Sequence, residues 1–361
     1  MNIYLDNSAT IRVRKEVISE MNRAMTEEYG NPSSVHALGE KARKTIDNAR
    51  AKIAKEIGAK PSEIYFTSGA TESNNLAILG LAKANPDKKT IVISDIEHPS
   101  VSGPCEQLKK RGYKVIKISS GKEGIVDYNQ LERVLRENRD VLIVSIMHVN
   151  NVIGTVNDIE RIGAICNKYR VLFHTDAVQS FGKIKIDVKK TNISLLSASG
   201  HKVGGPKGVG LLYIKDGLKV EPLVYGGGQE KGIRSGTENV PGIVGMAQAL
   251  EIINKVNKKK IEKQRNKLIK DLEAIGGEIN GSKTNRIYNN VNVSFDVDSD
   301  ILVQYLSDKG IYVSSGSACE SKKAKEVDGG IRIVLDETIG DKEINVIVKE
   351  IKNALKYLST N

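Results

Sequence analysis

The stretch around which the chain is organised reads Ser197-Ala-Ser-Gly-His-Lys-Val-Gly-Gly-Pro-Lys-Gly-Val-Gly210. Apolar runs stand on either side of it, at residues 193–196 and 209–214, and they predict two strands joined by a loop. Its glycines allow the backbone to approach another group closely, because no Cβ stands in the way. Lys202 lies in the middle of this loop, and its amine is either an ordinary surface cation or a nucleophile toward carbonyl carbons.

The length and composition favour a two-domain α/β enzyme. The chain has 361 residues, 39% of them hydrophobic and 27% charged, which is enough to bury one large core and a smaller one. It contains no tryptophan and only 4% aromatic residues, so we expect no stacking on nucleic-acid bases. The formal net charge of +11 predicts a lysine-rich exterior, and the alternative is a basic surface for RNA or an acidic partner.

The sequence also favours a cytoplasmic protein. The N-terminus has no basic segment followed by an apolar one, as a secretory signal would, and no apolar run approaches the roughly 18 residues of a membrane span. Three cysteines at distant positions argue against a disulfide framework and for a reducing compartment. We therefore expect no membrane association.

Strand and helix patterns alternate through the first two thirds of the chain. Short apolar runs without strict alternation are typical of a sheet covered on both faces. The candidate strands are 64–67, 90–94, 114–118, 141–147, 171–174, 193–197 and 209–214. This order predicts an α/β fold, with a large domain built on a mainly parallel seven-stranded sheet.

A long helical stretch at 240–275 is expected to contain the domain boundary. After Gly276-Gly277 the pattern changes to an alternating strand at 288–295, a helix at 300–309, a strand at 311–313 and a closing helix at 342–358. We predict a large domain over residues 13–250. A smaller α+β domain is predicted to combine residues 1–12 with 251–361.

Polar residues follow several of these strands, and ligands bind beyond the carboxyl ends of strands in such sheets. Thr67-Ser-Gly-Ala-Thr-Glu-Ser73 opens a helix, and it predicts either a phosphate site or a simple helix cap. His98 follows the second strand, and the alternative to a catalytic role is a structural one. Asp176 and Gln179 follow the strand at 171–174. With Lys202, these are the groups that pyridoxal 5'-phosphate needs: a phosphate anchor, a carboxylate for the ring nitrogen, a ring to stack and a Schiff-base amine.

Several motifs carry a resemblance that runs nearly from end to end. They are Tyr4-Leu-Asp-Asn-Ser-Ala-Thr10, Gly30-Asn-Pro-Ser-Ser-Val-His36, residues 67–75, Glu97-His98, Val149-Asn-Asn151, Asp176-Ala-Val-Gln-Ser180, Ser199-Gly-His-Lys202, Arg234-Ser-Gly-Thr237 and Ser314-Ser-Gly-Ser-Ala-Cys319. In these residues the chain resembles the cysteine desulfurases, the NifS/IscS-like branch of the class V aminotransferase-fold enzymes. The resemblance implies the fold type I of pyridoxal-phosphate-dependent transferases.

The resemblance also implies roles for individual residues. Lys202 would form the Schiff base with the cofactor, and Asp176 would hold the pyridine nitrogen. Gln179 would contact the ring hydroxyl, while His98 would stack on the ring and move protons. The phosphate would be held by Ala70, Thr71, Ser199, His201 and, from the other subunit of a homodimer, Thr237.

The substrate implied by the resemblance is L-cysteine, whose carboxylate would be bound by Asn151 and Arg332; Asn151 would also contact the cofactor. Cys319 stands in a run of small residues, an unusual setting for a core cysteine, and a reactive thiolate needs such exposure. It would take the sulfur as a persulfide while alanine is released. The sulfur would then pass to an acceptor protein, either an iron–sulfur scaffold or an enzyme of tRNA or cofactor thiolation.

No metal ion and no direct contact with nucleic acid are expected at the site. Cys105 and Cys166 lie on helical patterns, and we interpret them as structural. The chain departs from the family pattern at Val152, where glutamate is usual, in the shorter span from Cys319 to Arg332, and in Ile333-Val-Leu-Asp336. The alternatives are a selenocysteine lyase or another pyridoxal-phosphate β-lyase, and a weakened scaffold or RNA-binding protein on the same fold.

Overall fold

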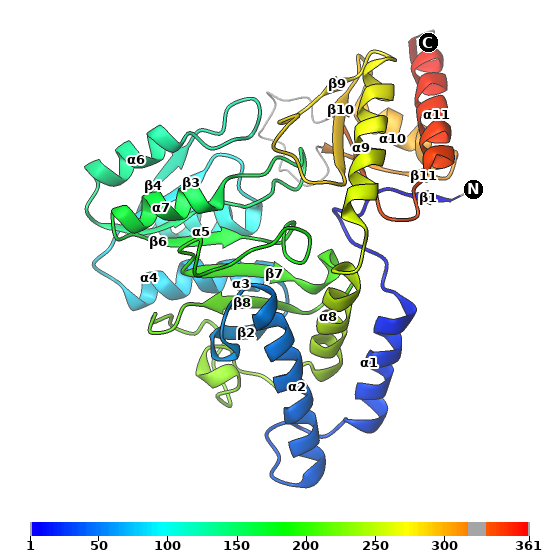
Figure 1. The fold of residues 1–361 in the computed structure, drawn as a ribbon. Helices are drawn as coiled ribbons and strands as arrows, with labels where there is room; N and C mark the ends of the chain where they lie inside the picture. The colour runs from blue at the N-terminus through cyan, green and yellow to red at the C-terminus, as the bar shows by residue number, and fades with distance from the viewer. Residues whose placement is uncertain (1, 317–329, 360–361) are drawn as a thin grey trace.

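The computed structural model describes residues 2–316 and 330–359. A seven-stranded sheet forms the centre of the larger part of the molecule (Figure 1), in the strand order β2-β8-β7-β6-β5-β3-β4. Its strands are β2 Ile64–Thr67, β3 Thr90–Ser94, β4 Lys114–Ile118, β5 Val141–Ser145, β6 Leu172–Asp176, β7 Leu195–Ser199 and β8 Gly210–Ile214. Only β8 in this sheet runs antiparallel to its neighbours. The predicted α/β fold with a mainly parallel seven-stranded sheet is therefore confirmed.

Helices cover both faces of this sheet, which explains why its strands read as continuous apolar runs. In β3, the neighbouring residues Val92 and Ile93 are both buried, but they belong to hydrophobic cores on opposite faces. One face packs against α1 Lys15–Glu27, α2 Ala37–Glu56, α6 Tyr128–Glu137, α7 Ile159–Lys168 and α8 Val240–Ile253. The other packs against α3 Ala70–Asn75, a π-helical turn Leu76–Gly80, α4 Leu81–Ala84 and α5 Pro99–Lys109. Short 3₁₀ turns lie at Pro61–Glu63, Gly200–Lys202 and Glu230–Gly232.

A separate hydrophobic core lies in the C-terminal part of the chain, together with Ile3 and Leu5 from the N-terminus. Its helices are α9 Lys258–Glu273, α10 Ser299–Asp308 and α11 Asp341–Ser359. An antiparallel sheet has the order β12-β13-β10-β9, from β9 Glu278–Ile279, β10 Asn290–Ser294, β12 Ser314–Ser315 and β13 Ile331–Val334. Strand β1, Ile3–Tyr4, pairs in parallel with β11, Ile311–Tyr312. The proposed division into domains at residue 250 stays a prediction.

The single helix expected over residues 240–275 is wrong, because the chain breaks it into two. Helix α8 ends at Ile253, and α9 begins at Lys258. The side chain of Asn257 accepts a hydrogen bond from the main-chain N–H of Lys260 at 3.1 Å, which caps a new helix at this point. Helical periodicity alone did not show the break, since both helices carry apolar residues at the same spacing.

Within residues 2–316 and 330–359, the helices are all too short or too polar to cross a bilayer.

Candidate active site

A pocket of about 440 Å³ lies at the carboxyl edge of the seven-stranded sheet. It is lined by residues that follow β2, β3, β5, β6 and β7, by the N-terminal segment and by one arginine of β13. Its volume suits a ligand of the size of a small cofactor with its substrate. Ten of the residues predicted from the sequence line it: Ala70, Thr71, His98, Asn151, Asp176, Gln179, Ser199, His201, Lys202 and Arg332.

Lys202 lies on the 3₁₀ turn that follows β7, and the N-terminal segment positions its amine. The Nζ atom donates hydrogen bonds to the main-chain oxygens of Ser8 at 2.6 Å and Ala9 at 2.9 Å. A Cβ on Gly205 would lie 3.1 Å from the Cα of Met246, so glycine there lets the loop pack tightly on α8. The expected close backbone approach is confirmed at this glycine, and Lys202 faces the pocket from a firmly packed loop.

Asp176 is the last residue of β6, and both of its carboxylate oxygens accept hydrogen bonds. Oδ2 accepts from Nδ2 of Asn74 at 2.8 Å, and Oδ1 accepts from the N–H of Val178 at 3.0 Å. Asn74 also donates to Oγ of Ser100 at 2.8 Å, and that hydroxyl lies 2.7 Å from Nδ1 of His98. These bonds fix the carboxylate and connect it to the imidazole on the same wall of the pocket.

The tautomer of His98 follows from its place at the start of α5. Its Nδ1 atom accepts a hydrogen bond from the main-chain N–H of Ser100 at 3.1 Å. A neutral imidazole that accepts at Nδ1 carries its proton on Nε2. The Nε2 atom of His98 therefore carries the proton, and this ring lines the pocket.

Gln179 is held by the same N-terminal residue that holds Lys202. Its Nε2 atom donates to the main-chain oxygen of Ser8 at 3.0 Å, and its Oε1 atom accepts from Oγ of Ser8 at 3.3 Å. The main-chain oxygen of Ser8 therefore receives hydrogen bonds from both Gln179 and Lys202. Ser8 therefore fixes the position of the Gln179 amide relative to the Lys202 amine.

One end of the pocket carries groups that suit an oxyanion. Thr71 lies in the first turn of α3, Ser199 ends β7, and His201 follows it. Burial lowers the pKa of His201 to about 4, helped by the charges of Lys202 and other nearby lysines, so its ring is neutral at pH 7. Hydroxyl groups, a neutral imidazole and the start of a helix form a donor set that fits a phosphate.

Arg332, on β13, lines the pocket on the side of the C-terminal core. Its Nη2 atom donates to Oδ1 of Asp6 at 2.8 Å and to Oγ of Ser314 at 2.7 Å, and Nη1 donates to the main-chain oxygen of Asn151 at 3.2 Å. Its buried Nε atom has no partner within residues 2–316 and 330–359. A buried guanidinium with a donor to spare suits the carboxylate of a substrate.

One predicted residue that the structure describes is not part of this pocket. Thr237 is exposed and lines a separate hollow with Tyr29 and Pro32. Cys319 lies outside the described residues. Cys105 and Cys166 are buried, as expected of structural cysteines, and burial raises the pKa of each thiol to about 12.

Ser8, Ala9, Asn74 and Ser100 are functional residues for which the sequence predicts no role. Asn74 and Ser8 both stand in motifs that carried the family resemblance, which was the available signal. Their contacts join positions far apart, such as Ser8 and Gln179, 171 residues away. Only the folded chain shows which partner each side chain meets.

Glu97, next to His98, is a buried acid behind the pocket. Its Oε1 atom accepts from Oγ of Ser94 at 2.5 Å and from the N–H of Met147 at 2.8 Å, while Oε2 has no partner in the part of the chain that the structure describes. Burial, together with the charge of Asp176, raises the pKa of Glu97 to about 8. The folded protein therefore keeps this carboxyl protonated at pH values where the unfolded chain has lost the proton.

The Glu97→Gln variant is expected to remove a pH dependence of stability. Between about pH 4.5 and pH 8 the folded state binds the extra proton, so this group lowers wild-type stability as the pH rises, by up to about 1.4 kcal/mol per pH unit. Glutamine carries no titrating proton. The free energy of unfolding of the variant, relative to that of the wild type, should therefore be higher at pH 8 than at pH 5. Urea unfolding at both pH values measures the difference, with Glu106→Gln, an exposed site, as the control. A constant difference would contradict a raised pKa.

The chain is similar to one family of known proteins over nearly its whole length. The model of the aminotransferase class-V family matches residues 3–345. A cysteine desulfurase IscS of Methanosarcina thermophila is 47% identical over 325 residues, covering 88% of this chain and 80% of that protein. A solved structure of a NifS-like protein superposes with a TM-score of 0.93 at 39% identity, covering 99% of this chain and 100% of that one. A second, described as SspA in complex with cysteine, has a TM-score of 0.83 at 37% identity and covers 93% and 99% of the two chains.

The chain belongs to the class-V aminotransferases, and within them to the cysteine desulfurases of the NifS/IscS kind.

Proposed function

We propose that this chain is a pyridoxal-phosphate-dependent cysteine desulfurase, which converts L-cysteine to L-alanine and takes the sulfur onto Cys319 as a persulfide. The observation that carries the proposal is the convergence of Lys202, Asp176, Gln179 and His98 in one pocket at the carboxyl edge of the sheet. The relatives support it, since several are named cysteine desulfurase and one was solved with cysteine.

The side chains of the pocket fit pyridoxal phosphate. Asp176, fixed by two hydrogen bonds, suits the ring nitrogen, and the Gln179 amide suits the ring hydroxyl. We assign the phosphate to Ala70, Thr71, Ser199 and His201, with Thr237 reaching it from a second subunit, and the Schiff base to Lys202. When bound, the cofactor supplies an electron sink that makes the substrate Cα–H acidic and activates the sulfur at Cβ.

The substrate is held and deprotonated by residues of this chain. Arg332 and Asn151, which line the same pocket as Lys202, would bind its carboxylate. Lys202 takes the Cα proton and returns it, and His98, with its proton on Nε2, moves protons at the ring. Its Nδ1 bond to Ser100 keeps the imidazole from turning away.

The sulfur step balances without an external oxidant. The Cβ–S bond of cysteine breaks, an S–S bond forms at the Cys319 thiolate, and Cβ gains a proton. Cysteine and an enzyme thiol thereby give alanine and an enzyme persulfide. We propose that an acceptor protein in the cytoplasm then takes this sulfur, for iron–sulfur cluster assembly or for the thiolation of tRNA or a cofactor.

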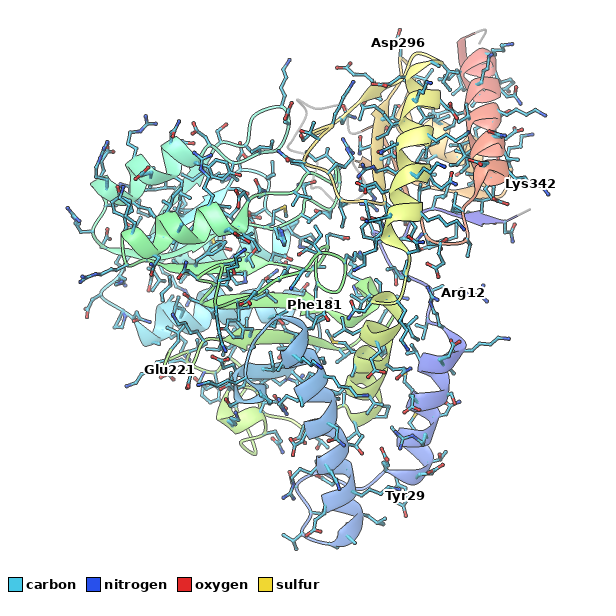
Figure 2. The ribbon with its side chains drawn as sticks, viewed as in Figure 1. Arg12, Tyr29, Phe181, Glu221, Asp296 and Lys342 are labelled. Carbon is cyan, nitrogen blue, oxygen red and sulfur yellow. The ribbon has the colours of Figure 1, made fainter. Side chains whose placement is uncertain are left out.

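We also propose that the chain acts as a homodimer. Three large side chains with apolar surface are exposed: Tyr29 is 67% exposed, Val35 90% and Tyr225 68%, and Tyr29 lines the same hollow as Thr237. Tyr29 lies just after the end of α1, far from the C-terminal core (Figure 2). Burial of this surface against a second copy would supply Thr237 to the partner's pocket. Sedimentation that returned only monomers at micromolar concentration would contradict this arrangement.

Purified protein tests the activity directly. We expect a visible absorbance band from the bound cofactor, and equal amounts of alanine and sulfide from L-cysteine in the presence of a thiol reductant. Faster turnover of selenocysteine would favour a selenocysteine lyase. Protein without cofactor and without turnover would favour a non-catalytic scaffold. Trapping the persulfide on Cys319 and mixing it with candidate acceptors identifies the one that discharges it.

A further inference from the structure

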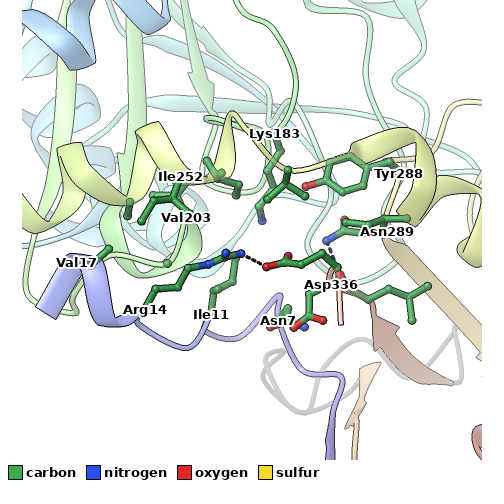
Figure 3. A pocket seen from close by; sticks show the side chains of 17 residues that line it. Asn7, Ile11, Arg14, Val17, Lys183, Val203, Ile252, Tyr288, Asn289 and Asp336 are labelled. Carbon is green, nitrogen blue, oxygen red and sulfur yellow. Dashed lines mark hydrogen bonds and ion pairs between the residues drawn. The ribbon is translucent and has the colours of Figure 1, made fainter. Parts of the chain in front are cut away.

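Behind the pocket lies a buried lysine that none of the steps above uses. Lys183 is 4% exposed and lines a cavity together with Ile253 of α8 and with Ile261 and Leu335 of the C-terminal core. Its side chain reaches a small cavity of about 40 Å³, with Arg14 on another wall and Tyr288 beside it (Figure 3). Burying an ammonium group is costly unless hydrogen bonds compensate for its lost hydration or it loses its charge.

The other side of Lys183 faces the active site through Gln179. The Nζ atom lies 3.5 Å from Oε1 of Gln179, a long hydrogen bond in which the lysine donates. Gln179 lines the active-site pocket, and Lys183 does not. Lys183 therefore reaches the site only through Gln179, and it contacts the amide on the side away from the pocket.

The contacts around the amide distinguish its two orientations. As observed, Nε2 donates to the main-chain oxygen of Ser8, and Oε1 points to the amine of Lys183. In the flipped orientation two oxygens would meet at the Ser8 carbonyl, and the amide NH₂ would face an ammonium group that has no lone pair. The hydroxyl of Ser8 can donate or accept, so it does not discriminate.

We propose that Lys183 is a positioning residue that fixes the orientation of the Gln179 amide, so that N–H rather than C=O is presented to the ring hydroxyl of the cofactor. This inference rests on the proposed function, because it deepens the role of the same pocket. In this orientation the amide NH₂ donates to the main-chain oxygen of Ser8 and has a second N–H for the pocket, and Lys183 supports the orientation by donating to the amide oxygen.

Several charged and titratable groups face Lys183. Lys202 and Lys258 are near enough to lower its pKa, which burial brings down to about 7. The cavity also carries the Arg14–Glu337 ion pair, Asp336 and the phenol of Tyr288. Near pH 7, therefore, part of the protein carries neutral Lys183, which can donate to Oε1 but could also accept from the amide NH₂, so the charged form is the one that discriminates between the two orientations.

The test compares Lys183→Met with Lys183→Arg in the holoenzyme. Methionine keeps the length of the side chain but has no donor, whereas arginine keeps a donor and can use the space of the cavity. The readout is the pH titration of the visible band of the bound cofactor. A hydrogen bond to the ring oxygen favours the deprotonated cofactor, so K183M should raise the midpoint by about one pH unit, and K183R should restore it.

Lys258→Met is the matched control. Lys258 is another cation near Lys183, but it donates to the main-chain oxygen of Gly182 at 2.9 Å and makes no hydrogen bond to Gln179 in the part of the chain that the structure describes. We expect K258M to leave the midpoint near the wild-type value. An unchanged midpoint in K183M would overturn the proposal, and equal shifts in K183M and K258M would overturn it too, because the effect would then be one of charge.

A second measurement needs no cofactor. In protein stripped of the cofactor, the urea midpoints of K183M, Gln179→Leu and the double variant should change non-additively, since the two side chains share one contact. Additive changes would overturn the inference. A wild-type protein that binds no pyridoxal phosphate would instead refute the proposed function, and the stripped-protein cycle would still decide on Lys183.

Discussion

Replacing Lys202 with alanine is expected to lower the turnover of cysteine by at least about 1,000-fold, the scale of losing a positioned base and nucleophile together. The amine is held by two main-chain oxygens at 2.6 and 2.9 Å, in a loop packed on α8. Alanine formation from cysteine measures the loss.

Two further variants separate the chemistry of Lys202 from its charge. Lys202→Arg keeps the cation, but a guanidinium does not deprotonate in proteins and should be as inactive as alanine. Added ethylamine should partly restore K202A, because a small amine can enter the vacated space. Substantial turnover by K202R would show that only the positive charge is needed, and would refute the assignment of the Schiff base and base to this amine.

Replacing Cys319 with alanine is expected to abolish sulfide formation from cysteine, to below about 1% of the wild type, since the acceptor thiolate is lost. The other two cysteines cannot substitute for it. Cys105 and Cys166 are buried in the cores that flank the sheet, and burial raises the pKa of each thiol to about 12. Neither is a thiolate at neutral pH.

The controls for Cys319 lie in the same chain. Cys105→Ala should keep its turnover while losing some stability, because it removes a buried sulfur from the core. Selenocysteine offers a second control, since a lyase that eliminates selenium directly would keep its activity in C319A. Full cysteine turnover by C319A would refute the persulfide mechanism.

The sheet and most of the site could be predicted because each is encoded locally. Apolar runs such as 90–94 and 141–145 mark strands buried on both faces, and the order of strands and helices points to a parallel sheet. Asp176 and Lys202 then stand where chains of this fold place ligand-binding residues, at the carboxyl ends of strands. A single sequence is sufficient for such features.

The supporting contacts could not be predicted, because they depend on distant pairs. Nothing in the spacing of Asn74 indicates that it meets Asp176, 102 positions later. Lys183 follows Gln179 by four residues and looks like one more lysine in a lysine-rich chain, until its burial is known. The break between α8 and α9 was missed because a capping asparagine inside an apolar period carries little signal.

The N-terminal segment has a consequence for how the protein is made. Ile3 pairs with Ile311, Asp6 bridges to Val334 and also binds Arg332, while Ser8 holds Lys202 and Gln179. These residues leave the ribosome long before their partners, and the contacts with Ile311, Arg332 and Val334 form only after those residues have been synthesised. Until then the pocket lacks Arg332, so a nascent chain with a complete parallel sheet still has no assembled catalytic pocket.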